Sequence, residues 1–170
     1  MVYGPPLWQS KSSIPDLNES NLRVWNLFLK SSSHVPMPPN GVHHFVDVRV
    51  SLRSACTAPK LMKSHLLKLL KDLADAHLQA LLRPLAGNKR LIVSRGPVTS
   101  QQIADILRTN LSELEHRTPL GVPGANTLPK DAYLLDSETA ADILGLAFRD
   151  IQDTFVDLGR YLLDSEKASK

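Results

Sequence analysis

The stretch HHFVDVR, residues 43–49, decides the fold together with the stretch DLADAHLQALLRP, residues 72–84. The first stretch alternates loosely between apolar and polar residues, which is typical of a short strand. The second lies in a sequence rich in Leu, Lys and Ala that runs from Leu61 to Leu85 and predicts a helix stopping at Arg83-Pro84. A strand followed by a helix indicates an α/β arrangement.

On the N-terminal side of these stretches, the chain begins with a short apolar piece that ends in Gly4-Pro5-Pro6, typical of a strand running into a turn. Asn18 or Ser20 can then cap a helix, because both types accept hydrogen bonds from free backbone N–H groups. We expect that helix to carry the apolar residues Leu22, Trp25, Leu27, Phe28 and Leu29.

On the C-terminal side, Leu91–Ser94 predicts a short buried strand, and Thr99 with Gln102 three residues later fits a capping box. Further helices are expected from Asp136 to Gly145 and, as an amphipathic helix, through Ile151, Phe155, Leu158 and Leu162. Several helices with two or three short strands indicate a mixed α/β fold. The sequence has no glycine-rich strand–turn–helix fingerprint and therefore encodes no dinucleotide pyrophosphate site.

Composition narrows the class of protein. The 170 residues are 42% hydrophobic and 22% charged, as in a globular domain, and no apolar run approaches the length of a membrane span. A single cysteine, Cys56, excludes an internal disulfide framework and a thiolate zinc site. The first residues show no secretory signal, so we expect a cytoplasmic protein without membrane contact.

The positive charge of the chain is concentrated in one segment. The net charge is +3, but Val50–Lys71 holds five Lys and Arg residues and no acid, so the rest of the chain has a net charge of −2. A basic patch confined to 22 residues does not indicate a nucleic-acid-binding protein. We therefore expect no nucleic-acid partner.

The order of the motifs carries a resemblance. MVYGPP, LNESN, HHFVDVR, DLADAHLQALLRP, GNKRLIVS, TSQQIADILR and LDSETAADILG follow one another and precede the closing amphipathic helix. This succession resembles the C-terminal half of the extended short-chain dehydrogenases/reductases, in the branch of dihydroflavonol, cinnamoyl-CoA and yeast-type methylglyoxal reductases. The resemblance implies the substrate-domain part of an extended Rossmann-type reductase, without the N-terminal dinucleotide-binding half.

The same resemblance implies where the chemistry resides. In the family, a serine and a Tyr-x-x-x-Lys pair in the N-terminal half assist hydride transfer from a nicotinamide, and the tyrosine protonates the carbonyl oxygen. None of the three tyrosines here is followed four residues later by lysine, so we expect no catalytic residue in this chain. Val2 and Tyr3 match positions where relatives lay a strand backbone beside the nicotinamide, and they are the expected cofactor-binding residues. NADP(H) is the cofactor implied for the family, and binding by this chain alone is in doubt.

The resemblance is interrupted between Arg49 and Asp72, which adjoin in relatives. The 22 intervening residues begin with valine and end with lysine, whose codons can supply the GT and AG borders of an intron. One hypothesis is a short fungal-type intron translated in frame, and the other is a genuine insertion. The expected organisation is a substrate-binding region over 1–49 and 72–164, a foreign basic insert over 50–71 and a tail over 165–170.

Several other polar residues have both functional and structural interpretations. Asn18 and Ser20 match positions near the cofactor ribose, but helix capping explains them equally well. Residues 31–44 match a variable substrate-facing loop, and His34, His43 and His44 lack an evident acidic partner for a metal, so no metal site is expected.

Structural roles are favoured for the remaining candidates. Asp47 and Arg49 are interpreted as a scaffold at the strand end. Asp72, Asp75 and His77 do not share a helix face. Cys56 is interpreted as an incidental thiol, and Leu61–Lys71 is basic and amphipathic enough to suggest an acidic partner or a membrane surface, an interpretation that we do not favour.

The sequence therefore favours an NAD(P)H-dependent reductase of a small ketone or aldehyde, of which this chain is a part that is inactive alone. The alternative is a noncatalytic protein-interaction module or a nonfunctional gene remnant. A dimer is neither indicated nor excluded.

Overall fold

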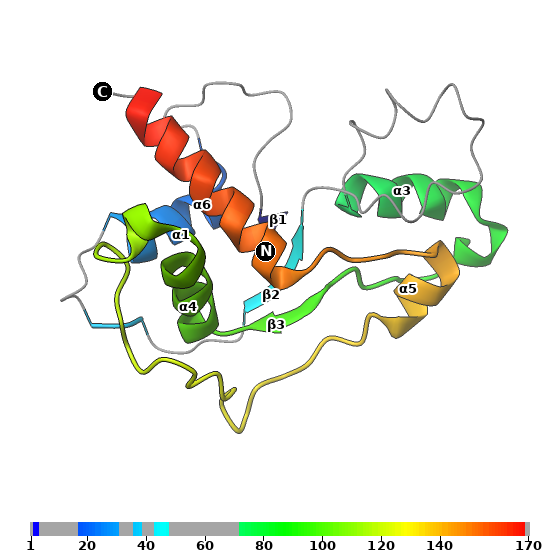
Figure 1. Ribbon diagram of the computed structural model, residues 1–170. Coiled ribbons are helices and arrows are strands. Elements are labelled where there is room, and N and C mark those ends of the chain that lie inside the picture. Colours follow the sequence, from blue (N-terminus) through cyan, green and yellow to red (C-terminus); the bar gives the residue numbers. More distant parts are fainter. Residues whose placement is uncertain (1, 4–16, 31–35, 39–42, 48–71, 169–170) are drawn as a thin grey trace.

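The computed structural model describes residues 2–3, 17–30, 36–38, 43–47 and 72–168 (Figure 1). The described residues do not include the expected insert at 50–71, nor Arg49 and Cys56, whose roles were predicted from the sequence. The described elements are β1 (Val2–Tyr3), α1 (Glu19–Val24), a π-helical turn η2 (Trp25–Leu29), β2 (His43–Asp47), α3 (Asp72–Leu82), a 3₁₀ turn η4 (Pro84–Ala86), β3 (Gly96–Val98), α4 (Ser100–Asn110), a 3₁₀ turn η5 (Ser112–Leu114), α5 (Glu138–Leu144) and α6 (Ile151–Ala168).

The described strands form one sheet in the order β1-β2-β3. β1 and β2 are parallel, with Val2 opposite Val46 and Tyr3 opposite Asp47, while β2 and β3 are antiparallel. Parallel neighbours need a crossover connection, and α1 and η2 lie in the one that joins β1 to β2. The mixed α/β class predicted from the sequence is confirmed.

The prediction of a strand at Leu91–Ser94 is wrong, because the strand forms a few residues later as β3. Leu91 and Val93 instead pack against a small apolar cluster around Leu144. The backbone joins β2 from Arg95 onward, where Arg95 N donates to the Phe45 carbonyl at 2.8 Å. Pro97 is tolerated in β3 because this strand pairs with β2 alone among the described strands.

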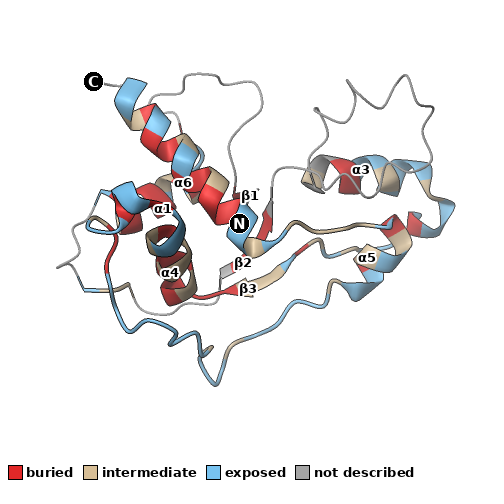
Figure 2. Ribbon diagram, in the orientation of Figure 1, coloured by how far each residue is buried: buried red, intermediate tan, exposed pale blue. Residues whose placement is uncertain are grey.

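The main core lies between the sheet and the crossing helices α4 and α6 (Figure 2). The ring of Phe155 on α6 lies 5.2 Å from that of Tyr3 on β1 and 5.7 Å from that of Phe45 on β2, measured between centroids. Leu158 and Leu162 follow Phe155 at helical spacing and are fully buried. The predicted amphipathic helix is therefore confirmed, and its apolar face closes over the sheet.

The far end of α6 is held by Arg117, in the loop after η5. Its guanidinium pairs with Glu166 at 2.8 Å and donates to the Leu29 carbonyl at 3.0 Å. The same group lies over the ring of Trp25, 5.8 Å from its centroid. One cation therefore joins α6, η2 and the loop after η5.

A second, smaller cluster joins α3, η4 and α5 through Ala76, Ala86 and Leu144. Beside it runs a chain of hydrogen bonds. Gln79 donates to the buried Asp75 at 3.1 Å, and Arg83 donates both to Gln79 and to the Ile143 carbonyl at 3.1 Å. This polar chain fixes α3 against the end of α5.

The helix caps lie at residues that the sequence predicts. The Asn18 side chain accepts from Asn21 N at 3.0 Å, so Asn18 rather than Ser20 is the cap of α1. Thr99 caps α4 by accepting from Gln102 N at 3.1 Å, as predicted. Gly145 ends α5 in the left-handed conformation with φ of 65°.

The caps of α4 and α5 give a matched test of stability. Thr99→Ala removes the bond to Gln102 N at a buried position and should lower the free energy of unfolding by about 1 kcal/mol. Ser137→Ala is the control, because Ser137 occupies the same position before α5 but forms no side-chain cap hydrogen bond. Urea denaturation compares the two variants, and equal losses would contradict the assigned role of Thr99.

Candidate functional site

The carboxyl ends of β1 and β2 meet at Tyr3 and Asp47, which lie opposite each other in the sheet. In open α/β sheets, ligands bind outside the carboxyl ends of parallel strands. The two predicted cofactor-binding residues, Val2 and Tyr3, therefore lie at the edge where the topology places a site.

The Tyr3 side chain points into the core rather than toward this edge. It is fully buried against Phe155, and burial raises the pKa of its phenol from 10.0 to about 12, although the positive charge of Arg23 opposes the shift. The burial of the side chain and its ring contact with Phe155 make Tyr3 a packing residue of the core. A cofactor at this position would contact the main chain of Val2 and Tyr3, and this remains a prediction.

A hollow of about 680 Å³ runs along α1, the helix that packs against β1. Its lining combines hydrogen-bonding groups with two leucines: Glu19, Ser20, Leu22, Arg23, Asn26 and Leu27. Asn18 and Ser20 were both predicted candidates for a position near the cofactor ribose. The structure gives them different roles, because Asn18 caps α1 while Ser20 lines the hollow. Such a lining suits a small polar ligand with an apolar portion.

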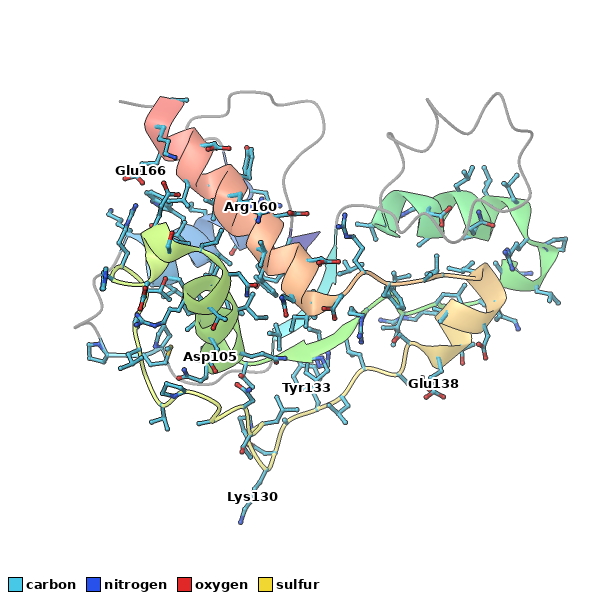
Figure 3. All side chains as sticks on the ribbon, viewed as in Figure 1. Asp105, Lys130, Tyr133, Glu138, Arg160 and Glu166 are labelled. Atoms are coloured by element: carbon cyan, nitrogen blue, oxygen red, sulfur yellow. The ribbon has the colours of Figure 1, made fainter. Side chains whose placement is uncertain are left out.

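The long segment between α4 and α5 is tied to the sheet by His44. The buried His44 ring forms a hydrogen bond through Nε2 with the Tyr133 carbonyl at 3.0 Å, and the two rings lie 5.0 Å apart. Figure 3 shows Tyr133 on this segment, beside β3. His44 thereby holds the segment against the sheet. His34 and the side chain of His43 lie outside the described part of the structure, and the described residues contain no metal-binding cluster.

The same segment is held at its other end by two side chains of α4. Gln101 donates to the Leu120 carbonyl at 3.0 Å and accepts from Val122 N at 3.0 Å. Asp105 accepts from Gln101 at 2.7 Å and from Gly124 N at 2.9 Å. Sequence reasoning missed this clamp, although the spacing of Gln101 and Asp105 by four residues places them on one helix face.

The other sequence candidates have structural roles. Asp75 is buried and bonded to Gln79, whereas His77 is exposed and bonded to the Leu73 carbonyl at 2.7 Å, so the two do not converge. The prediction that Asp75 and His77 do not share a face of the helix is confirmed. The structure does not describe the Asp47 side chain, so the scaffold role of Asp47 stays a prediction.

No family model matches the chain. A curated relative, the NADPH-dependent methylglyoxal reductase of Saccharomyces cerevisiae, is 34% identical over 100 residues, which are 56% of this chain and 28% of the relative. A putative methylglyoxal reductase of Candida albicans is 28% identical over 157 residues, 92% of this chain and 39% of the relative. The crystal structure of yeast methylglyoxal/isovaleraldehyde reductase Gre2 with NADPH superimposes on 98% of this chain with a TM-score of 0.75 and 26% identity.

This chain is a homologue of the Gre2-type reductases. The resemblance inferred from the sequence is thereby confirmed, and the fold matches a part of the Rossmann-type reductase structures. The chain spans 42% of the length of the yeast Gre2 structure, so the likeness covers only a part of that enzyme. No helix among the described residues is long and apolar enough to cross a membrane.

The buried phenol gives a pH test. Because the pKa of Tyr3 is about 12 when folded and 10.0 when exposed, the unfolded chain loses this proton first as the pH rises. The free energy of unfolding should therefore fall above pH 10, by about 1.4 kcal/mol per pH unit up to the folded pKa. Tyr3→Phe should remove this part of the pH dependence in urea titrations. Tyr133→Phe, at an exposed position, should leave it in place, and identical alkaline profiles for the two variants would contradict the placement of Tyr3.

Two glycines test the clamp on the segment after α4. Gly121 and Gly124 both have positive φ, but a Cβ at Gly121 would collide with the Gln101 side chain, whereas a Cβ at Gly124 meets open space. Both alanine variants carry the backbone cost of about 1 kcal/mol, and Gly121→Ala should in addition expel Gln101. Hydrogen exchange at Val122 and Gly124 should accelerate clearly more in Gly121→Ala, and equal protection in both variants would show that Gln101 does not hold the segment.

Proposed function

We propose that this chain is the substrate-covering part of an NADPH-dependent reductase that acts on small aldehydes or ketones. The observation that carries the proposal is the alignment of nearly the whole chain with yeast Gre2 at a TM-score of 0.75, supported by 34% identity to a methylglyoxal reductase. Methylglyoxal and isovaleraldehyde, which the names of these relatives specify, are the first substrates to test.

The geometry is compatible with a part of a larger sheet. β1 is two residues long and pairs in parallel with β2, and parallel sheets normally have several strands with both faces covered. We propose that the remainder of the reductase fold adds strands beyond β1. The nicotinamide end of the cofactor would then lie at the carboxyl end of β1, beside the main chain of Val2 and Tyr3.

The residues of this chain fit only one end of the cofactor. The nicotinamide supplies hydride when bound, and Ser20, Arg23 and Asn26 provide hydrogen-bonding groups along the neighbouring hollow. The glycine turn that cradles a pyrophosphate is absent from the sequence, as is a Tyr-x-x-x-Lys pair. The proposed roles of this chain are therefore to cover the substrate and exclude water, while proton transfer belongs to the other half of the fold.

The division of the chain is part of the proposal. Residues 1–49 and 72–164 form the substrate-binding region and 50–71 are an insert, while the tail expected at 165–170 begins inside α6, where Glu166 pairs with Arg117. Contacts between α3 and β2 support it, because they bring the elements on either side of the insert together. The cytoplasmic location expected from the composition stays a prediction.

The decisive experiment joins this chain to the other half of the reductase fold. A Gre2-type Rossmann half that ends with its Tyr-x-x-x-Lys helix is joined to residue 1, and residues 50–71 are deleted. This protein should oxidise NADPH with methylglyoxal or isovaleraldehyde, followed at the nicotinamide absorbance, whereas the 170-residue chain alone should stay at the blank rate.

The matched control replaces the tyrosine of the restored Tyr-x-x-x-Lys pair by phenylalanine, which should reduce the rate by roughly 10²–10⁴-fold. Turnover by the 170-residue chain alone would contradict the proposed division of labour. A restored protein that folds and binds NADPH but reduces neither aldehydes nor ketones would contradict the proposed substrate class.

A further inference from the structure

The hollow along α1 takes its charged and amide groups from one side of the helix. Glu19, Arg23 and Asn26 follow one another at i, i+4 and i+7 through α1 and the turn η2, so they share the face that lines the hollow. The other side of the helix, with Val24 and Phe28, is buried in the main core. The packing of the helix thus fixes which side chains a molecule in the hollow would meet.

Arg23 differs from most arginines of the described structure, because its guanidinium forms no ion pair and no hydrogen bond with the described residues. Ion pairs or hydrogen bonds engage Arg83, Arg108, Arg117, Arg149 and Arg160. Arg23 is also exposed. A guanidinium presents N–H donors in a planar fork, so this side chain can bind a planar anion that enters the hollow.

The charge of Arg23 reaches the carboxyl end of β1. Burial raises the pKa of the Tyr3 phenol, and the positive charge of Arg23 opposes that increase, so the guanidinium acts on the end of this strand. Helix α1 also packs directly on β1. The main chain of Val2 and Tyr3 is where we propose the nicotinamide end of the cofactor. A substrate that reacts beside this main chain therefore lies within the field of a cation.

The charges in the lining select a monocarboxylate among the possible anions. A carboxylate accepts two parallel N–H bonds from an arginine, and the Asn26 amide can donate another. Glu19 also lines the hollow, and its negative charge disfavours a dianion such as a phosphate monoester. Leu22 and Leu27 complete the lining and suit a short aliphatic chain.

We propose that this hollow binds the carboxylate of an oxo acid, an aldehyde or ketone that also carries a carboxylate, and that Arg23 determines this specificity. The inference rests on the proposed function for the reduction of the carbonyl group, whereas carboxylate binding by the hollow can be measured separately. The substrates that name the relatives, methylglyoxal and isovaleraldehyde, are uncharged, so the inference assigns this chain a different preference.

Binding of a matched pair of ligands tests the proposed specificity. The probes are levulinate and its methyl ester, which share a ketone and a carbon chain but differ in charge. In NMR titrations of the 170-residue chain, levulinate should shift the amide signals of α1 and bind at least ~5-fold more tightly than the ester. Equal affinities for the two probes, or no binding of levulinate, would overturn the proposal.

Two arginine variants test which cation is responsible. Arg23→Gln removes the charge at an exposed position, so it should abolish the preference for levulinate and leave binding of the methyl ester unchanged. Arg90→Gln is the matched control, because Arg90 is also exposed but does not line the hollow, and it should keep the preference. Loss of both ligands in Arg23→Gln, or the same change in both variants, would overturn the role of Arg23.

The reductase made by joining this chain to the other half of the fold separates this inference from the proposed function. There, Arg23→Gln should lower kcat/KM for levulinate at least ~5-fold, mainly through KM, and leave kcat/KM for methylglyoxal unchanged. Reduction of methylglyoxal, with no effect of Arg23→Gln on levulinate, would overturn the inference and leave the proposed function standing. Preferential binding of levulinate without reduction of any aldehyde or ketone would overturn the proposed function and leave the carboxylate site standing.

Discussion

The contact of Phe155 with Tyr3 and Phe45 is the interaction on which the rest of the fold depends. Two strands of only a few residues have little stability of their own, so the sheet exists because an aromatic ring from α6 covers β1 and β2 together. The α4 helix packs against α6, and Gln101 and Asp105 of α4 hold the segment that crosses to α5. Each later layer is thereby positioned by the one beneath it.

The two candidate functional regions draw on this arrangement in different ways. At the edge where β1 and β2 end, the Tyr3 ring belongs to the aromatic core and is positioned by its packing against Phe155. The hollow along α1 depends on the helix that the Asn18 cap begins and that packs on β1. Helix α3 is fixed separately, because Arg83 donates hydrogen bonds to Gln79 and to the Ile143 carbonyl.

Helix ends could be predicted from the sequence, but contacts between residues far apart in the chain could not. Thr99 and Gly145 mark the helix ends because capping and left-handed backbone depend on one or two residues. The strand at Gly96–Val98 escaped prediction because glycine and proline indicate a turn until β2 supplies the partner. The burial of Tyr3 and the bond from His44 to Tyr133 join residues far apart in sequence, which periodicity cannot reveal.

The pairing of Tyr3 with Phe155 also sets the order in which this protein can assemble. The first strand and the last helix lie at nearly opposite ends of the chain, so their contact closes a loop that includes almost every other element. Contacts of such high sequence separation slow folding, because the chain entropy is lost before the contact forms. During synthesis at about 5–20 residues per second, the contact between β1 and α6 cannot form until α6 has left the ribosome. This part of the core is therefore completed late, although β1 is made long before α6.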